Sequence, residues 1–545
     1  MGLACALLAP QPLAAAIRSD QQLLAIYARA RAADSLGAAE RAALDYSIAL
    51  ASAPGNQMLA SRALTQAVLA GNLPLAVKAA RVLEAGAVVA PDARFVLLVE
   101  AVRGGDWRKA DVQIASIERD EVFSFMAPVM RAWAAFGARN GDPLQPLSTA
   151  GSDSLALSYV AEHRPLLLLA MGREKEGLEA LGKLIAANNG RAYRVQLSAA
   201  ARLARGSDRQ RTLDWLKGDA EPLVDARQRV QEGKPLGGGI DTAPEGLAEF
   251  LLAMAIDLRR QDVTALALSF ARLSTFLAPD DSEAWLIVGS LLAAQNQKGA
   301  ALAALDHIGR DDPLADAAAD ARIRLLTASG EATLALKQAE KAARDKAAGA
   351  SDWIRLGDLY DELGRHREAA EAYTHARSAP RDTSATPEWT LWLLRGGSLL
   401  RAGNWPDAKA SLEAAYKLAP DQPVVLNYLG YAQLERRENM IEAEKLIRAA
   451  KRLDPESPQI TDSLGWARYL QGDLAKAIEL LEAAVRGEPA DPAINEHLGD
   501  AYFSAGRRYE ARYAWSAALV SAERKDAERI RAKLETGLAP ELAAP

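Results

Sequence analysis

The sequence predicts an all-α fold, built as a right-handed α-solenoid of stacked helix-turn-helix repeats. A Leu-Gly pair returns in YLGYAQLERREN (428–439), SLGWARYLQGDL (463–474) and HLGDAYFSAGRR (497–508), with its Leu at positions 429, 464 and 498. Hydrophobic residues make up 50% of the chain and aromatic residues only 6%, with Ala and Leu abundant. This composition favours helices over strands, and the regular return of the pair indicates a repeat array.

The repeat can be traced through most of the chain. Units start at Pro458 and Pro492, upstream at Pro423, Trp389, Ala350, Asp316, Ser282 and Ala248, and in the N-terminal part at Leu23, Gln57, Pro91, Ser158 and Ala192. The one long step, from 350 to 389, falls in SAPRDTSATPEW and predicts a lengthened loop. Residues 118–157 fit the template poorly, and 218–247, which contain KPLGGGIDTAPEG, do not fit it.

This pattern predicts five parts. They are a signal peptide at 1–16, N-terminal helical repeats at 17–217, an insertion or hinge at 218–247, a C-terminal repeat array at 248–525, and a capping helix with a tail at 526–545. The cap is expected because KDAERIRAKLETGL places Ile530 and Leu534 on one side of a helix and charges on the other.

Each unit carries the residues that two closely packed helices need. In the unit from Ala350, Trp353, Leu356, Gly357 and Tyr360 recur at helical spacing and form one face of a first helix. A glycine then ends that helix in a left-handed turn, at Gly364 here and at Gly37, Gly71, Gly105, Gly172, Gly330, Gly403, Gly472 and Gly506 elsewhere. The second helix carries Ala369, Tyr373 and Ala376, and Pro380 lies near its end. This arrangement is typical of the tetratricopeptide repeat (TPR), whose period is about 34 residues.

Three segments resemble a more specific family. They are WPDAKASLEAAYKLAPDQPVVLNYLGYAQL, PQITDSLGWARYLQGDLAKAIELLEAAV and PAINEHLGDAYFSAGRRYEARYAW. They are similar to the C-terminal repeats of exported TPR proteins of Gram-negative bacteria, closely over 389–520. Similar arrays include an outer-membrane lipoprotein that is the adaptor of a periplasmic C-terminal processing protease and delivers cell-wall hydrolases to it. The resemblance implies a periplasmic, outer-membrane-associated adaptor whose partner is a protein or peptide, such as a periplasmic protease or a cell-wall enzyme.

The N-terminus predicts export. MGLACALLAPQPLAAAI is uncharged and mostly apolar, and Ala14, Ala15 and Ala16 offer a signal-peptidase site before Ile17. Cys5, the only cysteine, lacks a lipidation motif around it. No later apolar run reaches the roughly 18 residues that span a bilayer, so no transmembrane segment is expected in the mature chain. A cytoplasmic location is the alternative.

Several function classes are disfavoured. The net charge is −6, with no basic excess for nucleic acid. None of the five histidines forms a pair four apart around a Glu, no GxSxG is present, and a single cysteine cannot build a cysteine metal site. We therefore expect no catalytic, cofactor or metal site and a non-enzymatic scaffold or adaptor for protein binding. The alternatives are a cytoplasmic TPR assembly factor and, from another class, a repeat-borne transferase or hydrolase.

The binding surface is expected on the concave side of the array, at positions two, five, nine and twelve of each first helix. In the last three repeats the candidate groove residues are Asn427, Tyr431, Asp462, Trp466, Tyr469, Glu496, Asp500 and Phe503, flanked by Val424, Leu434, Gln459 and Ala493. This set is aromatic and acidic, unlike the Lys, Arg and Asn that hold a C-terminal carboxylate in chaperone-binding TPR domains. The alternative is that Trp466 and Tyr469 belong to the core. If removing both aromatic side chains left the fold and the binding unchanged, the site would lie elsewhere, most plausibly at 218–247.

Overall fold

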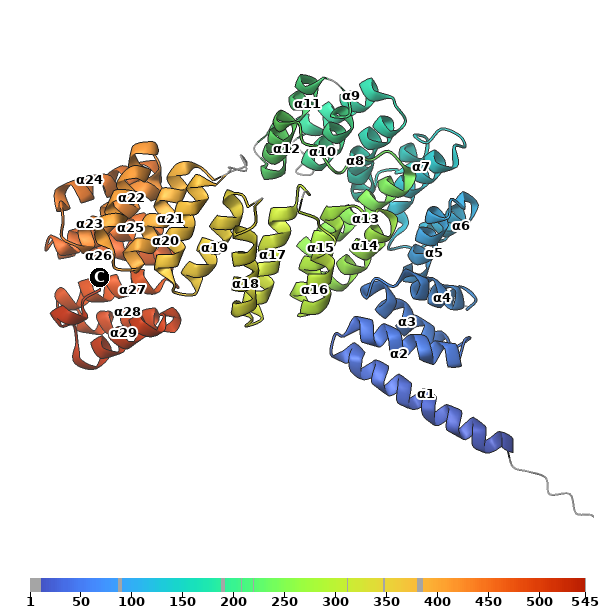
Figure 1. Cartoon of the computed structure of the whole chain (residues 1–545), viewed down its shortest axis with the longest axis horizontal. Helices are drawn as coiled ribbons and strands as arrows, with labels where there is room; N and C mark the ends of the chain where they lie inside the picture. Colours follow the sequence, from blue (N-terminus) through green and yellow to red (C-terminus); the bar gives the residue numbers. More distant parts are fainter. Residues whose placement is uncertain are drawn as a thin grey trace, which may run out of the picture. The chain divides into compact units, whose positions relative to one another are not determined.

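The structure, a computed structural model, describes residues 11–86, 91–187, 192–206, 208–218, 220–310, 312–346, 348–379 and 386–544. Every regular element in these ranges is helical, with 29 α-helices, three short 3-10 helices and no strand (Figure 1). The predicted all-α fold is therefore confirmed. Within the same ranges no helix is both long and apolar enough to cross a membrane.

The chain divides into two compact units, residues 1–335 and 336–545. The division comes at a different place from the stretch 218–247, whose role as an insertion or hinge stays a prediction, as do the other predicted boundaries. Residues 1–10 of the predicted signal peptide, with Cys5, lie outside the described residues, and so does the part of the predicted loop at 380–385, with Pro380.

The first unit holds the helices up to the start of α18. Their bounds are α1 Gln11–Ser35, α2 Ala39–Ser52, α3 Gln57–Leu69, α4 Leu73–Glu84, α5 Pro91–Arg103, α6 Trp107–Glu118, η1 Ser124–Met126, α7 Ala127–Ala138, η2 Pro146–Thr149, α8 Ser154–Ala170, α9 Glu174–Ala186, α10 Ala192–Leu203, α11 Arg209–Trp215, α12 Glu221–Glu232, α13 Ala243–Arg260, α14 Thr264–Leu277, α15 Ser282–Ala294, α16 Lys298–Leu305, α17 Ala315–Ala328 and α18 Ala332–Ala343.

The second unit is a regular series of helix pairs and a final single helix. Their bounds are α19 Ala350–Glu362, α20 His366–Ser378, α21 Glu388–Arg401, α22 Trp405–Leu418, α23 Pro423–Glu435, α24 Met440–Leu453, α25 Pro458–Leu470, α26 Leu474–Gly487, α27 Pro492–Ser504, α28 Arg508–Ser521, α29 Arg524–Thr536 and η3 Pro540–Leu542. Each odd-numbered helix from α19 to α27 packs on the even-numbered helix that follows it, and that helix packs in turn on the next odd-numbered one.

The predicted turn glycines are confirmed. All nine have a positive φ, from 68° at Gly105 to 83° at Gly472, in the left-handed region that costs other residues conformational energy. The turn between α23 and α24 has no glycine, and there Arg437 and Asn439 take the positive φ values, 52° and 49°. Asn tolerates this region better than most residues, which is why the RREN sequence can still turn.

In the second unit, a glycine inside each first helix from α19 to α27 lets the paired helices touch. A Cβ added to Gly465 of α25 would lie 2.8 Å from the Cγ of Leu481 on α26, and one added to Gly499 of α27 would lie 2.3 Å from the Trp515 ring on α28. The starts of α25 and α27 are also set locally. Ser457 and Asp491 accept hydrogen bonds from the N–H groups of Ile460 and Ile494, and a proline follows each cap.

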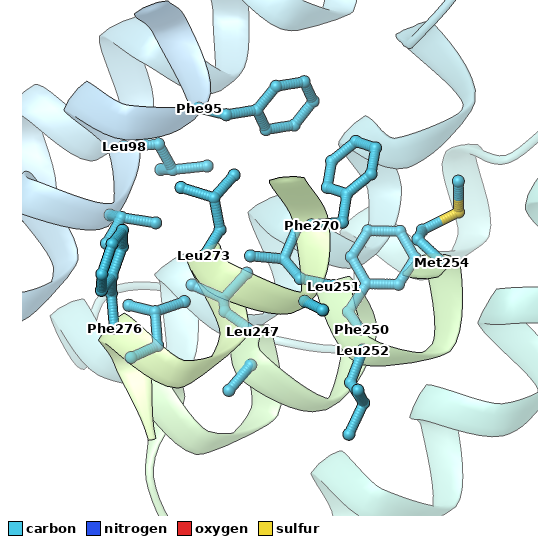
Figure 2. Packing of buried hydrophobic residues seen from close by; sticks show 14 of the residues in the cluster. Phe95, Leu98, Leu247, Phe250, Leu251, Leu252, Met254, Phe270, Leu273 and Phe276 are labelled. Carbon is cyan, nitrogen blue, oxygen red and sulfur yellow. The ribbon is translucent and has the colours of Figure 1, made fainter. Parts of the chain in front are cut away.

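In the first unit the chain returns to its own N-terminal repeats. Helix α14 packs against α3 and α5, and α13 packs against α7 and α8, although these partners are far apart in sequence. Figure 2 shows the resulting core, in which Phe270 of α14 meets Phe95 of α5 edge to face with ring centroids 5.1 Å apart. Phe95 occupies position five of α5, one of the positions that were expected to face the groove. Helix α14 therefore fills the groove side of this repeat.

The helices that come just before α13 in the sequence form a smaller group with a core of their own. Helices α10 to α12 share a core of Leu216, Leu223 and Val230. A capping box at Thr242 and Glu245 starts α13. The stretch 218–247 therefore contains α12 and the cap of α13, which its glycines and prolines had obscured in the sequence.

A buried ion cluster connects these helices to the rest of the first unit. Arg194 on α10 donates to both carboxylate oxygens of Glu249 on α13, at 2.8 and 3.0 Å, and pairs with Glu283 on α15. Burial, with the carboxylates of Glu283 and Glu249, raises the pKa of the neighbouring Asp281 carboxyl to about 7. Removing one partner from such a cluster leaves an uncompensated buried charge, so Arg194 is expected to stabilise this arrangement.

Candidate functional site

The candidate groove residues lie on α23, α25 and α27, the first helices of the last three repeats of the second unit. We call positions two, five, nine and twelve of these helices the inner face. The repeat places these side chains beside each other, because the first helices recur with the period of the repeat. Their exposure differs along the helix. Val424, Gln459 and Ala493, all at position two, are exposed, whereas most residues at positions five and nine are buried.

Trp466 belongs to the core. It is 1% exposed, and its ring stacks between His497, with centroids 4.2 Å apart, and Tyr469, at 4.5 Å. Its indole N–H has no hydrogen-bond partner among the described residues. The alternative in which this tryptophan packs against the neighbouring repeat is therefore the one that the structure shows. Tyr469 and Asn427 stay half-buried.

His497 connects three repeats. Its Nδ1 lies 2.9 and 3.0 Å from the two carboxylate oxygens of Asp462 on α25, and its Nε2 lies 3.4 Å from the hydroxyl of Tyr431 on α23. Burial acts to lower the pKa of the imidazole, but the carboxylates of Asp462, Asp500 and Glu496 outweigh it and raise the pKa above its usual value. The acidic residues of the inner face thus favour the charged form of this histidine.

The capping helix α29 covers the acidic residues of α27. Lys533 donates to Glu496 at 2.6 Å and to both oxygens of Asp500 at 2.7 and 2.8 Å, and its side chain is 0% exposed. Arg529 forms a two-bond pair with Glu496, at 2.7 and 2.8 Å. Asp500 also accepts from the indole of Trp515 and from the backbone N–H of Ala544. No lone pair of Asp500 faces solvent, because this carboxylate is fully buried.

The capping segment therefore turns most of the candidate groove at α27 into interior. Gly537 lies against the ring of Phe503, with an added Cβ 2.8 Å from its Cζ, and Leu538 packs in the same cluster. The acidic side chains that looked available for a partner are neutralised within the chain. The sequence analysis predicted a cap with its charges on the solvent side but missed that two of its basic residues, Arg529 and Lys533, are spaced i, i+4 and so face one side.

Besides the residues at position two, an exposed aromatic side chain lies next to the inner face on α23. Val424 is 43% exposed and Tyr428 36% exposed. The Tyr428 hydroxyl lies over Gly397 of α21, where an added Cβ would be 3.4 Å away. Arg401 of α21 pairs with Asp361 of α19. Tyr428 stands at position six of its helix, outside the four positions that were expected to point inward, which is why it was missed.

Inner-face positions are also open at the start of the first unit. Met58, Ser61 and Thr65 of α3 line a hollow together with Asp34 of α1 and Arg62. Asp34 accepts hydrogen bonds from Gln66 at 2.8 Å and from Tyr46 at 3.2 Å, so its carboxylate is already engaged. The hollow is a second accessible stretch, separate from the C-terminal repeats.

Among the described residues no group of three or more His, Cys, Asp or Glu is arranged to hold a metal ion. The buried His497–Asp462 pair resembles part of a catalytic relay, but its remaining nitrogen faces Tyr431 and the ring is closed off by Trp466. The His497–Asp462 pair therefore belongs to the packed interior of the second unit. That the chain is not an enzyme stays a prediction.

Comparison with protein families assigns the repeats. The family described as "Tetratricopeptide repeat" matches residues 354–423, 393–458 and 463–528. These residues are tetratricopeptide repeats. With the helical pairs described above, the chain has the predicted all-α TPR solenoid fold, a class of fold that provides scaffolds for protein interactions. A search of the curated proteins found no match.

Several solved structures match this chain, and three of them are as follows. The Cut9–Hcn1 hetero-tetramer of the APC/C has 15% identity and a TM-score of 0.37, covering 94% of this chain and 96% of that one. Yeast Tom70 has 15% identity and a TM-score of 0.35, covering 96% and 99%. A TPR protein from Parabacteroides merdae has 14% identity and a TM-score of 0.36, covering 53% and 97%. All three TM-scores lie below 0.5.

The burial of Trp466 predicts a structural effect of its removal. Trp466→Ala should lower the free energy of unfolding by about 3–5 kcal/mol, because it leaves a large cavity between α25 and α27. Ile441→Ala is the control, since Ile441 is 78% exposed and its loss should change stability by less than about 0.5 kcal/mol. Urea unfolding of both variants measures the difference, and equal midpoints would contradict the assignment of Trp466 to the core.

The raised pKa of His497 predicts a pH dependence. The charged His497 contributes to the free energy of unfolding. This contribution is fully present below the unfolded-state pKa of about 6.5 and is lost as pH rises through the higher folded-state pKa. Thermal unfolding of the second unit should therefore shift down by several °C between pH 6 and pH 9, and His497→Gln should reduce that shift. His375→Gln is the control, because it removes another histidine of the second unit, which stacks on Trp353 and is not part of the cluster around His497. An unchanged shift in His497→Gln would disprove the assignment.

Proposed function

We propose that the chain is a non-enzymatic adaptor that binds a segment of a protein partner on the inner face of its TPR array, in the cell envelope. The observation that carries this proposal is the pair of exposed side chains Val424 and Tyr428 on α23, at and next to the inner face, within the repeats that the family comparison matches. A TPR array presents its first helices to a partner, and exposed aromatic and aliphatic side chains there supply binding energy.

The accessible residues favour a particular kind of segment. Val424 and Tyr428 offer an apolar and aromatic surface, whereas Asp361 and Arg401 neutralise each other. The buried acidic residues Asp462, Glu496 and Asp500 already have partners within the chain. Binding should therefore depend mainly on apolar contacts and little on salt, because few unpaired charges remain on this surface.

The location and the partner class follow from the sequence. An uncharged apolar N-terminus that ends in Ala-Ala-Ala supports export, and the resemblance to exported TPR adaptors supports a partner such as a periplasmic protease or a cell-wall enzyme. Outer-membrane association is part of the same proposal. A cytoplasmic TPR assembly factor is the alternative that a retained N-terminus would favour.

The binding proposal predicts the effect of a double substitution. Val424→Ala with Tyr428→Ala should weaken partner binding by on the order of 1–3 kcal/mol, because both side chains contribute exposed contact area, and should leave the fold intact. Affinity capture from cell envelopes with mass spectrometry, followed by titration of the retained protein, measures this effect. Leu418→Ala on α22, where Leu418 is 52% exposed, is the matched control. Equal retention by the double variant and by the control would move the site elsewhere, for example to the hollow at Met58.

The export proposal predicts the mature N-terminus. The chain should start near Ile17 and fractionate outside the cytoplasm, because signal peptidase cleaves after small residues such as Ala14 to Ala16. N-terminal sequencing of the native protein and cell fractionation measure this directly. A cytoplasmic protein that keeps residues before Ile17 would contradict it.

A further inference from the structure

The outward face of α28, the second helix of the last repeat, is strongly apolar and uncovered. Tyr509, Tyr513 and Val520 are 81%, 77% and 87% exposed. They follow each other at i, i+4 and i+11, so they form one stripe along three turns of the helix. We call these three residues with Ser516 and Ala517, both exposed between them, the α28 stripe. Monomeric proteins rarely expose large side chains in such a row without a partner.

The TPR fold does not require this stripe. Helices α24, α26 and α28 start at Met440, Leu474 and Arg508, so their residues can be compared position by position. At the position of Tyr513 the preceding repeats have Lys445 and Glu479, and at the position of Val520 they have Arg452 and Arg486. All four are exposed charged residues, as expected for a solvated outer face. The last repeat replaces them with apolar side chains.

The ends of the stripe carry opposite charges. Arg508 is exposed at the start of α28, where its guanidinium lies 5.6 Å from the ring of Phe503, and Glu523 is exposed just after the end of the helix. Among the described residues neither forms an ion pair, whereas the neighbouring Arg507 is bound to Glu510. Arg524, which follows Glu523, pairs with Glu528 at 3.7 Å, so within the described part of the chain Glu523 is left as an anion without an ion pair at this end. Arg508 at one end and Glu523 at the other can therefore pair with each other when a second stripe is placed in the reverse direction.

We infer that the α28 stripe binds the same stripe of a second copy of this chain, with the two helices antiparallel about a two-fold axis. In this register Tyr513 of one copy lies opposite Ala517 of the other, a large side chain against a small one. Arg508 then lies opposite residue 522, next to Glu523 of the second copy. The two-fold axis repeats this pairing, so both charges of each copy gain an ion-pair partner.

The size of the surface fits a modest dimer. The two tyrosines alone present on the order of 300 Å² per copy, against the roughly 800 Å² per partner of a standard interface. The stripe thus supplies an apolar centre, and Arg508, Glu523 and the exposed Arg512 supply a polar rim. The inference does not depend on the proposed binding at the inner face, which lies on other helices.

Sedimentation equilibrium of the full chain tests the dimer. The wild type should pass from monomer to dimer between about 1 and 200 µM, as interfaces of this size allow. Tyr513→Glu should raise the dissociation constant more than tenfold, because it places a carboxylate in the apolar centre. Ile441→Glu on α24 is the matched control, since Ile441 is also nearly fully exposed, and it should leave the dissociation constant unchanged. Thermal unfolding confirms that each variant is folded.

A charge exchange tests the antiparallel register. Arg508→Glu and Glu523→Arg should each weaken the dimer several-fold, and the combined variant should restore it, because the pair is then re-formed in reverse. A wild type that stays monomeric up to about 200 µM would overturn the inference, since another molecule would then cover the stripe. A dimer that Tyr513→Glu leaves intact, or a combined variant weaker than both single variants, would overturn it equally.

Discussion

A pair of short helices cannot bury its apolar faces alone, and the rest of this structure depends on that constraint. Every pair needs a neighbour on both sides, so stability is shared between successive interfaces. The close crossing within each pair, where Gly465 meets Leu481 and Gly499 meets Trp515, keeps the pairs thin enough to stack at a constant period. A repeat array then has one remaining difficulty, which is the uncovered face at its last pair.

In the two units the chain covers two different faces with its own helices: an inner face in the first unit and the face of the last pair in the second. In the first unit α14 packs on α3 and α5, so the inner face at Phe95 becomes core. In the second unit α29 takes the place of the next first helix and brings Lys533 to Glu496 and Asp500. Buried ion pairs of this kind gain little net stability over apolar packing but penalise misplaced arrangements strongly, because each unpaired charge is costly. The cap is therefore specific as well as stabilising.

This covering decides where a partner can bind. The acidic and aromatic side chains of α25 and α27 are occupied by His497, Arg529 and Lys533. Accessible apolar residues remain at Val424 and Tyr428 and, on the outer surface, along α28. These two accessible surfaces lie on different repeats of the second unit, so the proposed partner and the proposed second copy would contact different helices.

The amino-acid sequence by itself determined the repeat length, the helix pairs and their turns, because these depend on local spacing and on glycine's conformational freedom. The glycines from Gly37 to Gly506 and the cap at Ile530 were predictable in this way. Only the tertiary structure decided which inward positions are exposed. Contacts such as Phe95 with Phe270 and Glu496 with Lys533 join residues far apart in sequence, and a periodic pattern contains no information about which distant helix returns to cover a face. The same acidic and aromatic residues therefore suit a binding groove or an interior equally well until their neighbours are known.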